Sequence, residues 1–306
     1  MIKTAVTEFE NYGKVLEITD GAVEVKVTLD VGPRVIYCGI PGKKNVFFCD
    51  LERNTSCKKP EMDAFYGEGR YWYLYGGYRL WMSPEYLPAT YYPDNDPVQY
   101  VIKQDSVTFI PPVQKENELQ MLYSLSFHGD GSITVNNRMI NFSNGKKHGA
   151  AWTLCVMGRN SHTFACQTDK DTGLLPNRTV VLWPYTKIYD KRITLTDRLI
   201  DVRQDPASDR ALKIGFNNEA GKVATLTEDG TLFIQKYSTD HISGAYPDGG
   251  CSCEIYSCPD FTEAECLSPL KTVLPGHSLD FAVEWKLCEF DKGSDPDTLT
   301  NVIENV

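Results

Sequence analysis

The sequence predicts an all-β protein, a large twisted antiparallel β-sandwich with a short C-terminal helix. Two observations predict this class. Apolar and polar residues alternate with a period of two in many short segments, and glycine-rich or aspartate-rich turns separate these segments. Many strands joined by short turns favour stacked sheets over alternating βαβ units. We detect no internal repeat and no linker, so we expect one domain over residues 1–306.

The clearest strand pattern lies near the N-terminus, where Val23, Val25, Val27 and Leu29 alternate with polar or charged residues. Such alternation is typical of a half-buried strand. Strand patterns occur at residues 21–30, 106–110, 121–127, 132–140, 179–183, 231–237 and 279–287. The turns between them include HGDGS at 128–132, SNGKK at 143–147, TEDGT at 227–231 and YPDGG at 246–250.

The segment DPDTLTNVIENV at 295–306 carries the clearest helix pattern. Asp295 can cap the first turn, and apolar residues form one stripe. That stripe consists of Leu299, Val302, Ile303 and Val306. We expect this C-terminal helix to dock on a face of a sheet.

The composition restricts the partners of the protein. There are 31 Lys and Arg residues against 41 Asp and Glu, a net charge of −10, and basic residues form no long cluster. This excludes nucleic acid and anionic membranes, because both bind a cationic surface. The N-terminal residues show no signal-peptide pattern, and no apolar run of membrane-spanning length occurs, so we expect a cytoplasmic protein.

The ten cysteines include the cluster CSCEIYSC at 251–258. In a cytoplasmic protein reduced thiols are favoured over disulfides. A structural zinc site usually needs a second pair of ligands, which the sequence does not offer. We therefore predict no metal and no cofactor. The sequence says nothing about the oligomeric state.

Aromatic residues are concentrated between Phe65 and Tyr100, a stretch that contains LYGGYRLWMSPE at 74–85. Tyr and Trp offer an apolar face with a polar edge, which suits the C–H face and hydroxyl rim of a sugar ring. Arg79 supplies fixed hydrogen-bond donors, and Glu85 supplies acceptors. The equally weighted alternative is a tyrosine-rich sheet surface packed under a loop or in a dimer interface.

A pair of glutamates marks the segment FTEAECLSP at 261–269. Glu263 and Glu265 alternate with Thr262 and Ala264, so both carboxylates lie on one face of a strand that ends before Pro269. One of them could be a buried base with a raised pKa. The alternative is a solvent-facing acidic edge strand.

Several motifs in a fixed order resemble the galactose mutarotase (aldose 1-epimerase) superfamily, and more closely a bacterial branch of it. They are GGYRLWMSPE at 76–85, YYPDNDPV at 91–98, NRMINFSN at 137–144, AAWTLCVM at 150–157, LLPNRTVVLWPY at 174–185, LKIG at 212–215, ECLSPL at 265–270 and LPGHS at 274–278. The resemblance implies the superfamily's β-sandwich, often called a supersandwich, with a small-molecule sugar in a concave cleft.

Family chemistry opens and recloses the sugar ring. A base takes the proton of the anomeric hydroxyl, and an acid protonates the ring oxygen. In typical members a Glu is the base and a His the acid. Glu265 falls on the base position. This chain has Tyr75 and Trp152 at the two positions where the family carries histidines, so the resemblance assigns no acid.

The resemblance also suggests further residues around the sugar. Lys213 falls near the family's substrate-holding aspartate, with a strand-surface lysine as the equal alternative, and Trp81 lies in the first motif. His148 is the best of five histidines as a replacement acid, although surface positions are the default. Trp183 and Asp190 could line the same cleft, with loop packing as the alternative.

Three hypotheses follow. The first is an aldose 1-epimerase-like isomerase with Glu265 as base and a sugar held by the residues Tyr75, Arg79, Trp81, Glu85, Trp152 and Lys213. The second is a sugar-binding or sensing protein that has lost the chemistry. The third is glycoside hydrolysis or lyase chemistry by two carboxyl groups such as Glu85 and Glu265.

Overall fold

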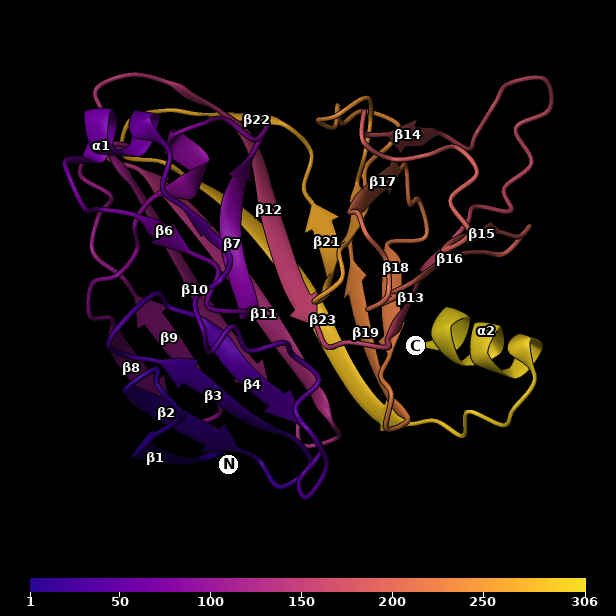
Figure 1. Cartoon of the computed structure of the whole chain (residues 1–306), viewed down its shortest axis with the longest axis horizontal. Helices are drawn as coiled ribbons and strands as arrows, with labels where there is room; N and C mark the ends of the chain where they lie inside the picture. Colours follow the sequence, from indigo (N-terminus) through magenta and orange to yellow (C-terminus); the bar gives the residue numbers. More distant parts are fainter.

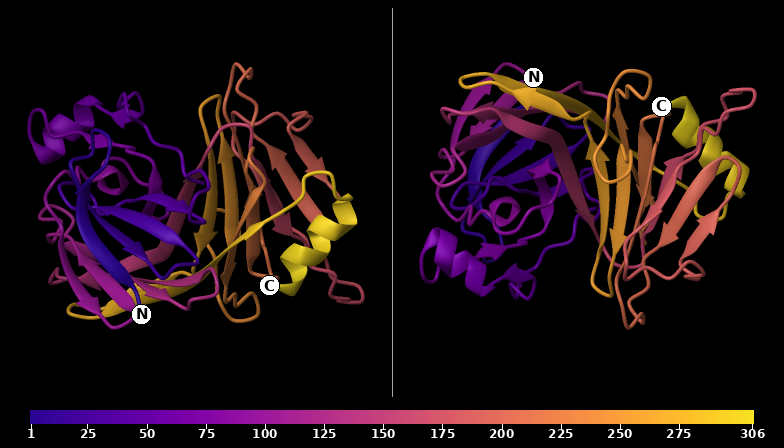
Figure 2. Two further views of the ribbon diagram at one scale, coloured as in Figure 1. Left: turned by 90° about the horizontal axis from the view of Figure 1, so that it is seen from below. Right: turned by 90° about the horizontal axis from the view of Figure 1, so that it is seen from above.

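Two large antiparallel sheets form the body of the molecule in this computed structural model, which describes residues 1–306 apart from the side chain of Pro296. The first sheet has eleven strands, and the second has ten (Figure 1). They pack face to face, as the two further views show (Figure 2). The predicted antiparallel β-sandwich is therefore confirmed.

The strands of the first sheet follow one another in space in an order different from their order in the chain. They are β1 (Lys3–Glu8), β2 (Lys14–Thr19), β3 (Glu24–Thr28), β4 (Val35–Gly39), β7 (Gly77–Ser83), β12 (Lys147–Met157), β21 (Thr262–Leu267), β20 (Cys253–Ser257), β17 (Leu212–Phe216) and β14 (Val180–Leu182), with β22 (Lys271–Val273) paired to β12. The centre of this sheet therefore joins segments far apart in sequence.

In the second sheet, too, the order of the strands in space differs from their order in the chain. It contains β15 (Ile193–Leu195), β16 (Leu199–Arg203), β13 (His162–Cys166), β18 (Lys222–Leu226), β19 (Thr231–Tyr237), β23 (Ser278–Glu289), β11 (Ser132–Asn141), β10 (Leu119–Phe127), β9 (Ser106–Ile110) and β8 (Gln99–Lys103). The hairpin β5 (Ser56–Cys57) and β6 (Trp72–Tyr73), the helix α1 (Pro60–Tyr66) and the 3-10 turn η1 (Ala89–Tyr91) lie outside both sheets.

The main core fills the space between the two sheets. Tyr78 of β7 contacts the Trp285 ring of β23 with centroids 5.1 Å apart, and Phe233 packs against Trp285 at 5.3 Å. All three side chains are fully buried. Because successive side chains of β7 point to opposite faces, Tyr78 and Leu80 face this core while Arg79 and Trp81 face the other side of the sheet.

Gly76 and Gly77 precede β7 because two neighbouring backbones approach them closely. A Cβ at Gly76 would lie 2.1 Å from the carbonyl oxygen of Phe48, and one at Gly77 would lie 2.1 Å from that of Val35. Both glycines also have positive φ, at +105° and +65°. The Gly-Gly pair therefore serves the fold and starts β7 in the correct position.

The C-terminal helix α2 (Pro296–Asn305) docks on the outer face of the second sheet, as predicted (Figure 1). Asp295 caps it by accepting a hydrogen bond from the Thr298 amide at 2.9 Å. The whole predicted stripe joins one cluster with Phe164 and Ile234. The sequence pattern did not reveal α1, which is short and has only Met62 and Tyr66 buried.

The docking of α2 gives a first testable prediction. Ile303 is fully buried against the second sheet, so Ile303→Ala is expected to lower the free energy of unfolding by about 2–5 kcal/mol. Urea denaturation followed by circular dichroism measures this change. The exposed neighbour Asn305→Ala is the control and should differ little from wild type. Equal stability of both variants would contradict the packing described here.

The ten cysteines are free thiols throughout the described chain, eight buried and two half-buried. Within the described residues, no helix has the length and apolar character needed to cross a membrane.

Candidate functional site

The outer face of the first sheet carries an unusual row in which three of four residues are charged. In an antiparallel ladder directly opposed residues share a face, so the pairing of the central strands defines that row. Across β7, β12, β21 and β20 it reads Arg79, Leu154, Glu265 and Glu254. On the same face, Trp81 lies opposite Trp152. Tyr256 of β20 lies between Glu263 of β21 and Lys213 of β17, and it is directly opposite both. Five strands thus contribute to one surface.

Lys213 is the centre of a buried charge network. Its Nζ atom lies 2.7 Å from Oε2 of Glu254 and 3.0 Å from Oε2 of Glu265. Glu265 also accepts a hydrogen bond of 2.6 Å from Nε1 of Trp152. The side chains of both glutamates are at most 1% exposed. One ammonium group therefore serves two carboxylates.

This network shifts the pKa of all three groups. Burial raises the pKa of Glu254 well above its ordinary value, and it also raises the pKa of Glu265, while the Lys213 ammonium acts in the opposite direction on both. Burial alone would lower the pKa of Lys213, but the carboxylates of Glu265 and Glu254 raise it overall. Lys213 therefore stays charged at neutral pH and is the shared counter-ion of the two carboxyl groups.

Arg79 and Glu263 form a second ion pair beside the first. Nη2 of Arg79 donates to Oε1 of Glu263 at 2.8 Å. The guanidinium lies over the Trp81 ring, 4.1 Å from its centroid, and 5.5 Å from the Trp72 centroid. Stacking on an indole fixes a planar guanidinium while leaving its edge free to donate.

Several polar atoms of this surface have no hydrogen-bond partner among the described residues. They are Nε and Nη1 of Arg79, Oε1 of Glu254 and Oε1 of Glu265. A buried polar atom without a partner costs roughly 1–3 kcal/mol. A ligand with hydroxyl groups both donates and accepts, so it could satisfy atoms of both kinds.

Aromatic rings surround the charged residues. Trp81 contacts Trp72, Tyr91 and Trp152, with ring centroids 5.2, 5.2 and 5.4 Å apart. The Nζ atom of Lys213 lies over two indole rings, 4.6 Å from the centroid of Trp152 and 4.8 Å from the centroid of Trp183. Four of the five tryptophans of the chain therefore lie at this surface, and the fifth, Trp285, lies in the core.

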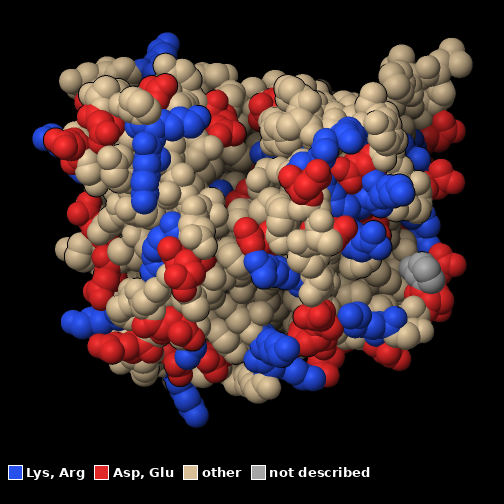
Figure 3. Space-filling view, viewed as in Figure 1, with Lys and Arg blue, Asp and Glu red and all other residues tan. Residues whose placement is uncertain are grey.

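Two adjoining cavities open on this surface, and we call them together the aromatic cleft. The first has a volume of about 270 Å³ and is lined by Thr55, Ser56, Trp72, Leu74, Arg79, Trp81, Glu85, Tyr91, Trp152, Leu154, Tyr185, Lys213, Tyr256, Phe261 and Glu263. The second, of about 290 Å³, is lined by Glu85, Leu87, Trp152, Trp183, Lys213, Asp248 and Glu254. Glu85, Trp152 and Lys213 belong to both. Figure 3 shows a hollow between the two halves of the molecule, with acidic and basic side chains in it.

Most of the predicted site residues come together in the aromatic cleft. Arg79, Trp81, Glu85, Trp152 and Lys213 line it. The predicted base Glu265 lies just beneath, covered by Trp152 and Lys213 and absent from the lining of both cavities. Its neighbour Glu263 is the carboxylate of that strand at the cavity surface.

Tyr75 is placed elsewhere. It packs with Tyr12 and Ile36 in a separate cluster, and its hydroxyl donates to Oδ1 of Asn95 at 2.7 Å. Its backbone has a left-handed φ of +58° at the turn into β7. Neither cavity of the aromatic cleft includes it.

The structure adds residues that sequence analysis missed as site residues. Glu254 and Tyr256 of β20, Tyr185, Tyr91, Trp72 and Asp248 all line the aromatic cleft. Glu254 and Tyr256 alternate along a strand just as Glu263 and Glu265 do, and this alternation is the signal in the sequence that could have assigned them to the site. Trp183, expected there as one alternative, does line the second cavity, whereas Asp190 pairs with Arg192 outside it.

No histidine lines either cavity within the described residues. His148 of β12 contacts Oγ1 of Thr272 at 3.1 Å and faces a different hollow, which shares Glu85 with the aromatic cleft. His241 stacks on Tyr246, and burial lowers its pKa. The described residues also contain no cluster of metal-binding side chains.

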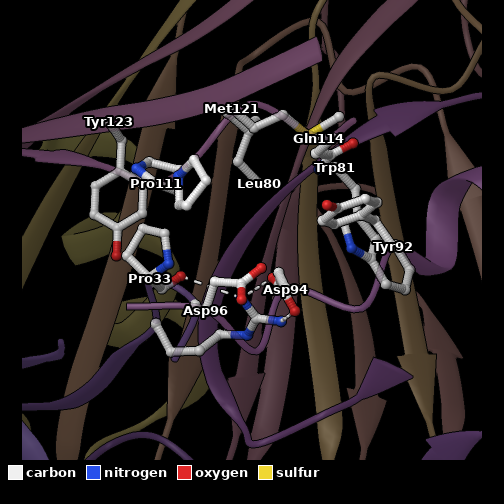
Figure 4. Close-up of a pocket in the computed structure, with 13 residues that line it drawn as sticks. Pro33, Leu80, Trp81, Tyr92, Asp94, Asp96, Pro111, Gln114, Met121 and Tyr123 are labelled. Carbon is white, nitrogen blue, oxygen red and sulfur yellow. Dashed lines mark hydrogen bonds and ion pairs between the residues drawn. The ribbon is translucent and has the colours of Figure 1, made fainter. Parts of the chain in front are cut away.

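A small cavity lies beside Trp81, which forms part of its lining (Figure 4). Arg34 and Asp94 form a bidentate pair at its edge, and the Tyr123 hydroxyl and Nε of Arg34 have no partner among the described residues. Its volume of about 30 Å³ is enough for one or two water molecules. It is too small for a sugar ring, so the aromatic cleft remains the candidate site.

No protein-family model matches the chain, and a search of curated proteins finds no match. Several solved structures do match. A Klebsiella pneumoniae protein provisionally named an aldose 1-epimerase has a TM-score of 0.62 at 11% identity, over 99% of this chain and 86% of that one. A galactose mutarotase-like protein from Lactobacillus casei has a TM-score of 0.54 at 9% identity, over 90% and 100%.

The same fold also occurs within a longer protein. A TPR-domain containing protein from Parabacteroides distasonis matches with a TM-score of 0.59 at 14% identity, over 92% of this chain but 49% of that one. At such low identities the likeness establishes the fold alone. The chain has the galactose mutarotase-like fold, as the sequence motifs implied.

Proposed function

We propose that the protein binds a small-molecule sugar in the aromatic cleft. One observation carries this proposal: two ion pairs lie between tryptophan rings on the same outer face of the first sheet. The pairs are Arg79–Glu263 and Lys213–Glu265. Such a surface combines flat apolar walls with fixed donors and acceptors. A sugar ring needs both, because its C–H faces pack on indole while its hydroxyl groups require hydrogen-bond partners.

The proposal is tested by isothermal titration calorimetry with a panel of aldoses and their amino, N-acetyl, oxidised and phosphorylated derivatives. Saturable binding of at least one sugar is expected. If no sugar of the panel gave a saturable heat of binding, sugar binding would be wrong as the function.

A second candidate function is aldose 1-epimerase-type isomerisation with Glu265 as the base. Burial raises the pKa of Glu265, as general base catalysis near neutral pH requires, and its Oε1 atom has no partner among the described residues. Contact with a sugar requires Trp152 or Lys213 to move aside, because both cover it. The absence of a histidine from the cavity linings of the described chain favours binding without chemistry.

Two matched variants decide between binding and catalysis. In Glu265→Gln, sugar binding is expected to persist while any acceleration of anomeric exchange falls by at least about 100-fold, the usual contribution of a general base. Glu263→Gln, two residues away on the same face, is expected to weaken binding because Glu263 lines the cavity and orients Arg79. Exchange is measured by NMR saturation transfer between the two anomers. Exchange that survives Glu265→Gln would contradict the role of Glu265 as base.

A further inference from the structure

The second cavity of the aromatic cleft is strongly acidic. Three carboxylates line it, those of Glu85, Asp248 and Glu254, against the single ammonium of Lys213. That ammonium is already within ion-pair distance of two glutamates, at 2.7 and 3.0 Å. Because Lys213 is engaged by these two glutamates, the lining residues offer no unpaired cation for a negatively charged ligand.

A second observation points to a ligand with donor groups. Glu254 is 1% exposed and lines the cavity, yet its Oε1 atom has no hydrogen-bond partner in the described chain. Glu85 accepts from the Tyr91 hydroxyl, and Asp248 accepts from Oγ of Ser83 at 3.3 Å. Both of these carboxylates retain lone pairs for a further donor. Acceptors thus dominate this end of the cleft.

The aromatic walls favour a positive group in the same place. Trp152 and Trp183 line the cavity, and the Lys213 ammonium already lies within 5 Å of both ring centroids. Indole faces attract cations. A second ammonium from a ligand would meet indole faces and carboxylates, whereas a phosphate or carboxylate group would meet like charges in a partly desolvated cavity.

We infer that the second cavity selects the sugar by charge: it binds an amino sugar in preference to the uncharged parent sugar, and it rejects phosphorylated and oxidised sugars. The inference rests on the proposed sugar-binding function and adds a substrate class to it. The geometry that supports it is the placement of Glu85, Asp248 and Glu254 around a tryptophan-lined space.

Calorimetry with four ligands tests this inference at fixed pH 7 and fixed salt: a hexose, its 2-amino-2-deoxy form, the N-acetylated amine and the hexose 6-phosphate. The amino sugar is expected to bind about tenfold tighter than the parent hexose, because its ammonium forms charge-assisted hydrogen bonds. N-acetylation should abolish this gain by removing the charge. The 6-phosphate should bind at least about tenfold more weakly than the hexose.

A pair of variants locates the effect. Asp248 is half-buried at a positive φ of 51°, which asparagine also tolerates, so Asp248→Asn is expected to keep the fold and to reduce the preference for the amine. Asp209→Asn, at an exposed position in a different hollow, is the control and should leave it unchanged.

The outcomes separate the two claims. If the hexose binds but the amino sugar binds no tighter, or if the phosphate binds best, the charge selection is wrong and sugar binding stands. If none of the four ligands binds, while the wider panel yields a binder that is acidic, the charge selection is also wrong. If no sugar of any kind binds, both proposals fail.

Discussion

Replacing Lys213 with methionine is expected to lower the free energy of unfolding by about 3–5 kcal/mol at pH 8, and by clearly less at pH 5. The methionine keeps most of the volume of the side chain but removes the only ammonium that pairs with Glu254 and Glu265 among the described residues. Two buried carboxylates then remain without a counter-ion, and breaking a buried ion pair in this way has a cost of this size.

The pH dependence has a definite sign. Burial already raises the pKa of both glutamates above the ordinary value of 4.5, and loss of Lys213 raises it further. A carboxyl group with a raised folded-state pKa stabilises the fold below its unfolded-state pKa, and this contribution is lost as the pH rises through the folded-state value. The variant is therefore expected to gain stability between pH 8 and pH 5 relative to wild type.

Urea denaturation followed by tryptophan fluorescence measures this effect at both pH values. Adding Glu254→Gln and Glu265→Gln to Lys213→Met removes the unpaired charges and should recover much of the loss at pH 8. If Lys213→Met were as stable as wild type at pH 8, Lys213 would not be the counter-ion of the two glutamates, and the charge network described above would be wrong.

The second large effect concerns sugar affinity. Arg79→Met is expected to weaken the binding of any sugar ligand about 30-fold, on the scale of ~2 kcal/mol for a hydrogen bond to a charged group. The physical reason is that Arg79 lines the aromatic cleft and has two nitrogen atoms without a partner in the described chain. Calorimetry with the best sugar of the panel measures it.

Arg34→Met provides a matched control. Arg34 is buried to the same degree as Arg79 and also pairs with one carboxylate, Asp94, at 2.6 Å. It lines the small cavity beside Trp81 and neither cavity of the aromatic cleft. Both variants should lose stability, but only Arg79→Met should lose affinity. A similar loss of affinity in both would mean that the effect passes through stability and not through contact with the sugar.

The sequence predicted the elements of the fold well where a strand has one buried and one exposed face. The strand predicted at residues 279–287 lies within β23, where buried and more exposed side chains alternate, and the apolar stripe of the last segment located the docked helix. Alternation also placed Glu263 and Glu265 on one face, because side chains of a strand alternate regardless of its partners. The alternative of an exposed acidic edge strand is wrong, since β21 lies between β12 and β20 in the middle of the sheet.

Other features could not be predicted because they depend on which strands become neighbours. Glu254 joins the site only because β20 pairs with β21, and Lys213 only because β17 pairs with β20. Tyr75 precedes the Gly-Gly pair in the sequence, but the turn directs its side chain to Tyr12 and away from the cleft. Spacing along one chain carries no information about such lateral contacts.

The aromatic-rich stretch around LYGGYRLWMSPE contributes both to packing and to the lining of the candidate cleft. Tyr78 is a core residue, and Trp72 and Trp81 are largely packed against other rings. The same two tryptophans also form a wall of the first cavity. The packed cluster and the wall of the candidate cleft are therefore built from the same rings, which composition alone could not separate.

The tryptophan distribution provides the most direct test that a sugar binds in the aromatic cleft. In a protein labelled with ¹⁵N-tryptophan, each of the five indole groups gives one NMR signal, assigned by single Trp→Phe variants. During titration with the best sugar of the panel, the signals of Trp72, Trp81, Trp152 and Trp183 are predicted to shift in a saturable way. The signal of Trp285, buried in the core, is predicted to stay in place. Saturable binding that leaves the four cleft signals unmoved would place the sugar elsewhere and contradict the central claim.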